Sequence, residues 1–166
     1  MNFKIRRASH TDAAGIIDAH RCSIREVCSD DYTEEQINVW SGRDFKEEVW
    51  REIMDKDTVE VIVDTSEAIF GFCHHGYTSK EKKIYEIKGL YLCPQVLGKG
   101  LGSKLVSNAV DHSAVNGCTS IILYSTKTAQ KFYEYKGFSL VAERSMEMQG
   151  IKLPCLEMSM EIKKMV

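Results

Sequence analysis

The sequence predicts a mixed α/β fold, in which a mostly antiparallel central sheet is flanked by helices. Three observations support this prediction: apolar residues recur at helical spacing early in the chain, β-branched runs of strand length fill its middle, and the two patterns then alternate. A chain of 166 residues with 43% hydrophobic and 28% charged residues suits one core. We therefore expect residues 1–166 to form a single domain.

The first part of the chain predicts one strand followed by three helices. The segment "FKIRRA" (3–8) predicts a strand, and Ser9 or Thr11 can cap the helix that follows it. The segment "TEEQINVWSG" (33–42) begins with the form of a capping box, because a glutamine stands three residues after its threonine. The segment "FKEEVWREIMDK" (45–56) has apolar residues at helical spacing.

The rest of the chain predicts six strands and two helices. We expect strands near 58–64, 68–79, 82–93, 119–125, 138–148 and 153–162, and helices that start at Leu101 and near Thr128. The third of these strands changes character along its length. Ile84 to Lys88 alternates as a half-exposed strand does, whereas Leu90 to Cys93 is continuously apolar, which predicts burial on both faces. Gly89 lies at the change and indicates a bulge or a close backbone approach.

Composition excludes several classes of protein. A net charge of −2 gives no electrostatic case for a nucleic-acid partner. No run of apolar residues is long enough to cross a membrane, and the polar N-terminus has no secretory signal. The six cysteines form no C-x-x-C pair and no zinc-ligand spacing, so we expect no metal and a reduced, cytoplasmic protein.

The segment "QVLGKGLGSKL" (95–105) places three glycines at alternate positions, Gly98, Gly100 and Gly102, at the start of a predicted helix. A helix N-terminus exposes unpaired N–H groups, and glycines remove the Cβ atoms that would keep a large anion away. The pattern therefore indicates a phosphate or pyrophosphate site. Neither the Walker A loop nor the dinucleotide fingerprint fits, because both would need a glycine where Ser103 stands.

Three motifs in order resemble those of the GNAT superfamily of N-acetyltransferases. Gln95, Gly98 and Gly100 match the Q-x-x-G-x-G form of its acetyl-CoA loop. The segment "TAQKFYEYKGF" (128–138) is similar to its A-x-x-F-Y-E-x-x-G-F segment, and "EIKGLYLCP" (86–94) to the strand that enters the loop. The resemblance covers residues 58–148 well. It implies a GNAT-like acyl-CoA N-acyltransferase fold in a small bacterial-type member, with acetyl-CoA as co-substrate.

The resemblance also implies the residues that contact the cofactor. Leu97 departs from the family pattern, in which a polar residue is commoner, and Thr126 replaces a frequent asparagine whose hydrogen bond a hydroxyl can still donate. The implied cofactor contacts are Leu90, Leu92, Gln95, Val96, Leu97, Gly98, Lys99, Gly100, Leu101, Gly102, Ser103 and Thr126.

Acetyl transfer to an amine needs a base, because an alkyl ammonium at pH 7 is neutral in only about one molecule in a thousand. The resemblance implies Glu86 for this role. A solvated strand face shared with Lys88 is an equal interpretation of Glu86, and a water relay or one of the adjacent histidines, His74 and His75, is an alternative base.

Two further roles follow from the same chemistry. The resemblance implies Tyr133 as proton donor to the leaving thiolate, although a core tyrosine packed beside Phe132 would show the same pattern. A backbone N–H near Leu92 would stabilise the oxyanion if the strand splays there, as it does in the family.

The sequence and the resemblance together predict a reaction and five candidate residues for its acceptor site. The predicted function is transfer of an acetyl group from acetyl-CoA to a primary amine of a small molecule, amino acid or peptide, by direct attack in a ternary complex. The alternative is a non-catalytic acetyl-CoA-binding sensor or interaction module, and a homodimer is left open. The acceptor candidates are Arg21, Arg25, Tyr32, Trp40 and His75.

Overall fold

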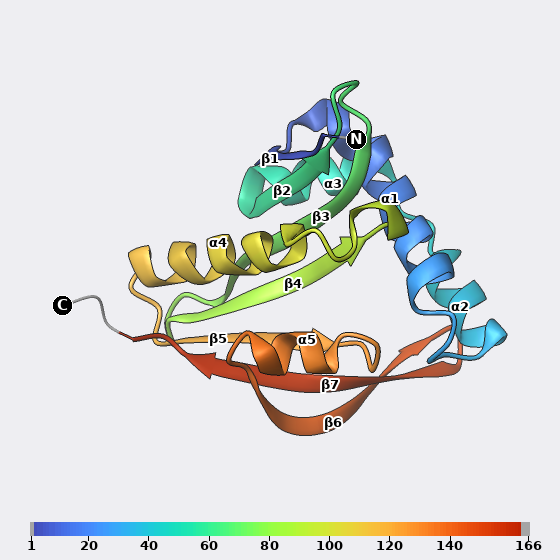
Figure 1. The fold of residues 1–166 in the computed structure, drawn as a ribbon. Helices are drawn as coiled ribbons and strands as arrows, with labels where there is room; N and C mark the ends of the chain where they lie inside the picture. The colour runs from blue at the N-terminus through green and yellow to red at the C-terminus, as the bar shows by residue number, and fades with distance from the viewer. Residues whose placement is uncertain (1, 164–166) are drawn as a thin grey trace.

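The computed structural model describes residues 2–163, which form a seven-stranded sheet with helices on both faces (Figure 1). The mixed α/β class and the mostly antiparallel sheet are confirmed, and each predicted helix and strand is present with small shifts at its ends. Short 3₁₀ helices lie at His10–Asp12 and Pro94–Val96. The main elements are β1 (Lys4–Arg7), α1 (Ala13–Val27), α2 (Glu34–Ser41), α3 (Glu47–Lys56), β2 (Thr58–Val63), β3 (Ile69–Ser79), β4 (Ile84–Leu92), α4 (Leu101–Val115), β5 (Ser120–Ser125), α5 (Gln130–Tyr135), β6 (Ser139–Met148) and β7 (Ile151–Glu161).

The strands lie in the order β1-β2-β3-β4-β5-β7-β6. All neighbours are antiparallel except β4 and β5, which are parallel and are connected through α4. A parallel pair needs such a crossover, because its strands start at the same edge of the sheet. The one parallel step therefore lies in the middle of the sheet, where α4 begins after the glycine-rich loop.

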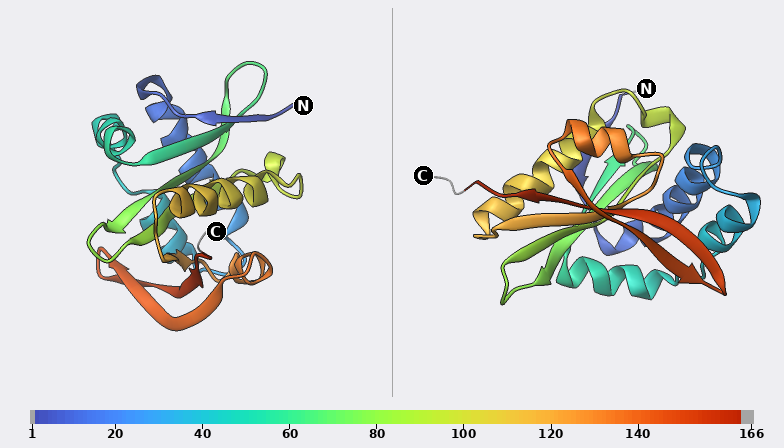
Figure 2. Two further views of the ribbon diagram at one scale, coloured as in Figure 1. Left: turned by 90° about the vertical axis from the view of Figure 1, so that its left-hand side faces the viewer. Right: turned by 90° about the horizontal axis from the view of Figure 1, so that it is seen from below.

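Helices cover the two faces of the sheet unequally (Figure 2). On one face lie α1, α2 and α3, and Trp50 of α3 is packed with Ile16 and Phe72 in one buried cluster. On the other face lie α4 and α5, and Leu105 of α4 belongs to a cluster with Ile121 of β5. Within residues 2–163 no helix is long and apolar enough to cross a membrane.

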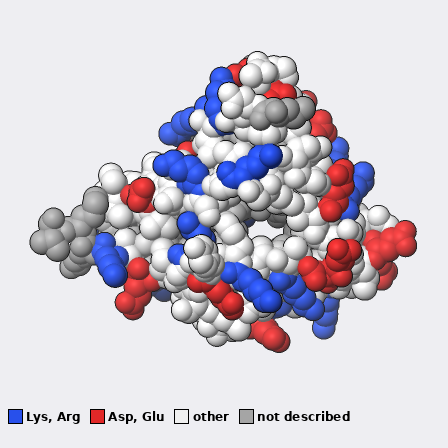
Figure 3. All heavy atoms as spheres, viewed as in Figure 1, with Lys and Arg blue, Asp and Glu red and all other residues white. Residues whose placement is uncertain are grey.

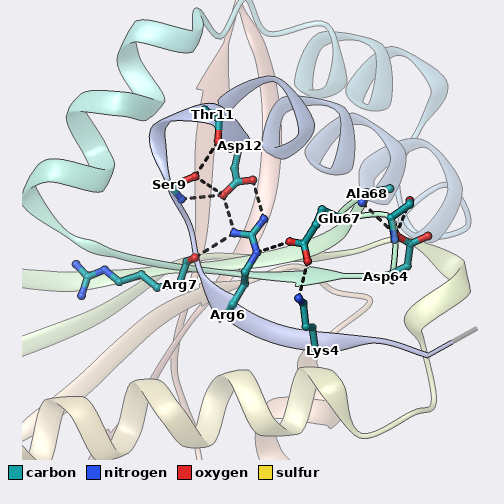
Figure 4. Close-up of polar contacts among 10 residues, drawn as sticks. Lys4, Arg6, Arg7, Ser9, Thr11, Asp12, Asp64, Glu67 and Ala68 are labelled. Atoms are coloured by element: carbon teal, nitrogen blue, oxygen red, sulfur yellow. Dashed lines mark hydrogen bonds and ion pairs between the residues drawn. The ribbon is translucent and has the colours of Figure 1, made fainter.

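Capping and ion pairing fix the N-terminal helices. The predicted capping box of α2 is confirmed, because Thr33 Oγ1 accepts the N–H of Gln36 at 3.2 Å and Gln36 Oε1 accepts the N–H of Thr33 at 2.9 Å. Arg6 of β1 donates two hydrogen bonds to the buried carboxylate of Asp12, at 2.8 and 2.9 Å, and one to Glu67 at 2.7 Å (Figure 4). Hydrogen bonding to Arg6 holds the pKa of Asp12 below its ordinary range, so this pair fastens β1 to the start of α1.

Candidate active site

The sheet opens between β4 and β5. The two strands pair only from Ile84 with Ser120 to Ile87 with Leu123, although β4 continues for five more residues. Beyond that point β4 stays paired with β3, and β5 stays paired with β7. The two strands therefore diverge in a V, which is visible in Figure 1, and the backbone edges that line the V have no partner strand. The splay that the resemblance implied is present.

A bulge in β4 reverses which side chains face each side of the sheet. Ile87 pairs with His75 and Gly89 pairs with His74, so Lys88 is an extra residue without a partner on β3. The bulge predicted near Gly89 is confirmed. An extra residue shifts the alternation by one. Tyr91 therefore lies on the face of α1 and α3 together with Glu86, although the two residues are an odd number of positions apart. Leu90 and Leu92 lie on the face of α4.

Two pockets meet at the open end of the V, since they share lining residues, and Figure 3 shows the surface hollowed there between β4 and α5. The first, which we call the apolar pocket, has a volume of about 270 Å³ and no charged side chain in its lining. Its lining explains the continuous apolar run of β4. The prediction that this run is buried on both faces is wrong, because Leu90, Tyr91 and Leu92 are only half-buried. The apolar pocket is lined by Ser23, Val27, Cys28, Leu90, Tyr91, Leu92, Leu97, Thr126, Thr128, Ala129, Phe132 and Tyr133.

Tyr133 of α5 lies in the wall of the apolar pocket. Its side chain is 5% exposed, and its ring contacts Phe132 and Phe138 at centroid distances of 5.1 and 5.8 Å. Tyr133 therefore packs in the core and also borders the pocket, and its role as a proton donor stays a prediction. Burial raises the pKa of the Tyr133 hydroxyl, so the hydroxyl keeps its proton at neutral pH.

The glycine-rich loop has an open, left-handed backbone at two positions. Gly98 and Gly100 have φ values of +68° and +76°, and a Cβ added at either would meet no atom within 4 Å. Gly102 differs, because its Cβ would lie 2.9 Å from Leu92 Cδ1, so this glycine allows α4 to pack on β4. The N–H of Lys104 donates to the carbonyl of Gly100 at 3.0 Å as α4 begins, and the N–H groups before it open toward solvent in the manner of an anion site.

The other residues of the loop differ in what they can offer. Val96 is 1% exposed and packs in the core, so its predicted contact with a cofactor is restricted to its backbone. Gln95 and Lys99 are exposed, and Leu101 and Ser103 are half-buried at the start of α4. The loop thus presents backbone and a few polar side chains beside the apolar pocket.

The second pocket, which we call the charged pocket, has a volume of about 170 Å³. Glu86 lies in its wall, and burial raises the pKa of this carboxyl group. Lys88 does not pair with Glu86, because its ammonium group contacts Asp57 Oδ2 at 2.8 Å. The charged pocket shares Tyr91 and Thr126 with the apolar pocket. It is lined by Tyr32, Trp40, Glu86, Ile87, Lys88, Tyr91, Tyr124, Thr126, Met146, Leu153, Pro154 and Cys155.

The two adjacent histidines lie on opposite faces of β3, as expected, but neither lines a pocket of the V. His75, an acceptor-site candidate, is 1% exposed on the face of α4, and its Nδ1 pairs with the Tyr85 hydroxyl at 2.8 Å. His74 Nε2 contacts Asp57 Oδ2 at 2.7 Å. The structure therefore places His75 in the core, outside the linings of both pockets, whereas Glu86 lines the charged pocket.

The other acceptor candidates separate into two groups. Tyr32 and Trp40 line the charged pocket, whereas Arg21 and Arg25 line neither pocket. Arg25 Nε instead donates to Ser41 Oγ at 3.1 Å and connects α1 with α2. The two arginines are thus displaced from the acceptor role that the sequence suggested.

Ser23 is a site residue that the sequence analysis missed. It is 5% exposed, lines the apolar pocket, and its Oγ accepts the backbone N–H of Leu92 at 3.2 Å. An oxyanion donor was expected among the backbone N–H groups near Leu92, and the N–H of Leu92 itself is already engaged by a side chain. A polar residue on the apolar face of the first helix was the available signal for Ser23. Tyr91, Tyr124 and Met146 were also missed. Tyr91 lies within the motif of residues 86–94 but was not singled out there, and no local motif marks Tyr124 or Met146.

Comparison with known proteins identifies the family. A family model described as an acetyltransferase (GNAT) domain matches residues 28–162. The chain therefore belongs to the GNAT acetyltransferase family, which supports acetyl transfer as its chemistry. A search of curated proteins found no match. In residues 2–163 no three His, Cys, Asp or Glu side chains come together as metal ligands would.

Solved structures with low sequence identity share the fold. A GCN5-related N-acetyltransferase from Rhodopseudomonas palustris is 19% identical, with a TM-score of 0.83 over 97% of this chain and 96% of that one. The PaiA N-acetyltransferase from Thermoplasma acidophilum, in complex with coenzyme A, is 20% identical, with a TM-score of 0.72 over 97% and 99% of the chains. A GNAT superfamily phosphinothricin acetyltransferase from Sinorhizobium meliloti, in complex with acetyl-CoA, is 19% identical, with a TM-score of 0.74 over 98% and 89%.

Proposed function

We propose that this protein transfers the acetyl group of acetyl-CoA to a primary amine in a ternary complex. The observation that carries this proposal is the pair of pockets that meet at the open V and share Tyr91 and Thr126. In the proposal, acetyl-CoA binds in the apolar pocket and along the glycine-rich loop, and the amine enters from the charged pocket. Direct attack requires both substrates to be held together, which two adjoining pockets allow.

Three features fit acetyl-CoA. The apolar pocket suits the pantetheine arm, because its lining has no charge to desolvate. The N-terminus of α4 suits the pyrophosphate, with Gly98 and Gly100 holding the loop open and Lys99 exposed beside it. The edge of β4 beyond Ile87 is not paired with β5, so its backbone can bond to the amides of the arm. When bound, acetyl-CoA supplies an activated acetyl group.

Glu86 is the proposed base. An alkyl ammonium group must lose a proton before it can attack, and at pH 7 this costs about 4 kcal/mol. Glu86 lies in the charged pocket, and its raised pKa makes it a better proton acceptor than an exposed glutamate. The proton moves from the ammonium nitrogen to the carboxylate, directly or through one water molecule, and the nitrogen lone pair becomes available.

Tyr133 is the proposed acid, from the opposite pocket. As the new C–N bond forms and the C–S bond breaks, the sulfur of CoA leaves with the bonding electron pair. The protonated hydroxyl of Tyr133 donates to that sulfur. The nitrogen, which carries a positive charge once the C–N bond has formed, loses its second proton to solvent water and becomes the neutral amide, and the Tyr133 phenolate is then reprotonated from solvent. Because the Leu92 N–H is engaged, the Ser23 hydroxyl, which retains its own proton, is the proposed donor to the carbonyl oxygen.

Chromatographic measurement of free CoA tests this function. Acetyl-CoA is incubated with the protein and a panel of amines, amino acids and peptides, and the released CoA is quantified. Thiol-reactive dyes are unsuitable, because the chain itself has six cysteines. Release that depends on the acceptor supports the enzyme, whereas binding of acetyl-CoA without release for any acceptor supports a sensor or interaction module.

A further inference from the structure

Two hydroxyl groups that line the charged pocket already have partners within the protein. The Tyr32 hydroxyl donates to the carbonyl of Pro154 at 2.9 Å and accepts the N–H of Lys127 at 3.1 Å. Thr126 Oγ1 accepts the N–H of Ala129 at 3.2 Å. These bonds hold the wall in place. The Tyr32 hydroxyl has no proton left to donate to an acceptor, whereas the Thr126 hydroxyl keeps its own.

Only two charged side chains line this pocket, Glu86 and Lys88. The ammonium group of Lys88 is held by Asp57 Oδ2 at 2.8 Å, and Asp57 also contacts His74. The lining therefore offers one carboxylate, at Glu86, and one ammonium group, at Lys88, which is already paired with Asp57. A bound ammonium group can pair with Glu86, whereas a bound carboxylate would have to share Lys88 with Asp57.

The remaining wall is aromatic and apolar. Tyr32, Trp40 and Tyr91 contact one another edge to face, with ring centroids 5.5 and 6.2 Å apart in successive pairs. Tyr124 of β5 and Met146 of β6 complete the wall. The volume of about 170 Å³ is below the roughly 300–1,000 Å³ of ordinary ligand pockets, so a bulky acceptor does not fit inside it.

We propose that the acceptor is a compact monoamine, in which one primary ammonium group is attached to an apolar or aromatic body that has neither a carboxylate nor a second ammonium group. This inference rests on the proposed function and adds the class of its substrate. Its physical basis is desolvation, because a charge that enters the pocket without a partner loses its hydration and gains no ion pair. A carboxylate would have to compete with Asp57 for Lys88, and a second ammonium group would compete with the first for Glu86.

Matched pairs of amines test the class. We compare 2-phenylethylamine with L-phenylalanine, which adds a carboxylate, and butylamine with 1,4-diaminobutane, which adds an ammonium group. We expect kcat/KM to be at least about tenfold higher for the monoamine of each pair. The first comparison is biased against the proposal, since an α-amino group has a lower pKa and is more often neutral. Equal or higher kcat/KM for L-phenylalanine or the diamine overturns the inference.

A variant pair tests the aromatic wall. Tyr124 lines the charged pocket and is 47% exposed, whereas Tyr135 of α5 is 89% exposed and lines neither pocket of the V. We expect Tyr124→Ala to raise the KM for 2-phenylethylamine several-fold more than the KM for butylamine, and Tyr135→Ala to change neither. An equal effect of Tyr124→Ala on both amines contradicts an aromatic subsite.

Calorimetry of acetyl-CoA binding separates the two levels of the proposal. If acetyl-CoA binds but neither the four amines nor any acceptor of the wider panel causes CoA release, the acetyltransferase function is overturned together with its acceptor class. If release occurs only with an amino acid or peptide of that panel, the function stands and the monoamine class is overturned. If release occurs with L-phenylalanine or the diamine as the better substrate, the function stands and the monoamine class alone is overturned. Release with the monoamines as the better substrates supports both.

Discussion

The apolar and charged pockets adjoin at one opening of the sheet but differ in charge and in the chain segments that line them. The apolar pocket has no charged side chain in its lining, whereas the charged pocket contains Glu86 and Lys88. In the proposed reaction the first side holds a thioester away from charged groups and the second removes a proton. The difference indicates that the V separates binding of the thioester from removal of the proton. Substitutions in the two pockets should therefore affect different kinetic constants.

The largest effect is expected for Glu86→Gln. Loss of the base should lower kcat/KM by about 10²-fold or more, while the Kd of acetyl-CoA stays unchanged, because Glu86 lines only the charged pocket. Steady-state kinetics and calorimetry measure the two effects. Glu134→Gln is the matched control, since Glu134 is an exposed carboxylate of α5 that pairs with Gln130. Weaker binding of acetyl-CoA with unchanged kcat/KM would contradict this prediction, because Glu86 would then act in cofactor binding and not as the base.

The same variant predicts a change in pH dependence. Burial raises the pKa of Glu86 above its ordinary value, so the carboxylate is lost and kcat/KM falls as the pH drops through that raised pKa. This acidic limb should disappear in Glu86→Gln. Ionisation of the amine gives a second limb of the pH profile, which moves with the pKa of the acceptor. Profiles measured with two amines of different pKa therefore distinguish this limb from the limb of Glu86.

A smaller effect is expected for Tyr133→Phe. We expect kcat to fall by about 10²-fold at most, the low end for general acid catalysis, because a thiol with a pKa near 8.5 is already a good leaving group. The Kd of acetyl-CoA should stay nearly intact. Tyr135→Phe serves as the control on the exposed side of α5. Unchanged turnover in Tyr133→Phe would remove this hydroxyl from the mechanism.

For Gly100→Leu we expect weaker cofactor binding rather than slower chemistry. Gly100 has a φ of +76°, a conformation that costs an L-residue about 1–2 kcal/mol, so the loop should rearrange and the Kd of acetyl-CoA rise about tenfold. Gly117→Leu is the control, because Gly117 has a φ of +71° and equally open space at the other end of α4. Equal weakening by both substitutions would contradict a phosphate site at the loop.

The smallest effect on activity is expected for a substitution of His20, which packs against Tyr91, the tyrosine that both pockets share. His20 of α1 is 4% exposed, and its ring lies 4.5 Å from that of Tyr91 between centroids. Burial, with the charges of Arg43 and Arg21, lowers the pKa of His20 to about 4. The folded chain therefore keeps His20 neutral, while the unfolded chain binds a proton below about pH 6.5.

The free energy of unfolding should consequently fall as the pH drops from about 6.5 to about 4, by up to about 3 kcal/mol. Below pH 4 this contribution levels off. Urea denaturation across this range measures the slope, which His20→Phe should reduce. His10→Phe is the control at an exposed histidine. If His20→Phe keeps the full slope, the loss of stability in acid originates elsewhere.

The sequence predicted the apolar side of the site better than the charged side. Leu90, Leu92, Leu97 and Tyr133 line the apolar pocket and belong to short motifs, and local spacing is enough to place them at a strand end, before a helix start and on a helix face. The charged pocket joins segments from residue 32 to residue 155, which come together only when α2 and β7 pack at the V. No periodicity contains that information.

Two particular errors have the same physical origin. Alternation on β3 correctly separated His74 from His75, but which face would be covered by α4 depends on tertiary packing, and His75 became a core residue. Arg25 stands on the helix beside the site, yet its guanidinium group is used to join α1 with α2. In both cases the residue type suggested reactivity, and packing assigned it a structural contact.

The bulge at Lys88 has a consequence for how this site can change during evolution. Because the extra residue reverses the alternation of β4, deletion of one codon there would turn the segment from Gly89 to Leu92 over as a block. Tyr91 would move toward α4, and Leu90 and Leu92 toward the acceptor. A single insertion or deletion at this point therefore exchanges the walls of both pockets at once, a change that would otherwise need several independent substitutions.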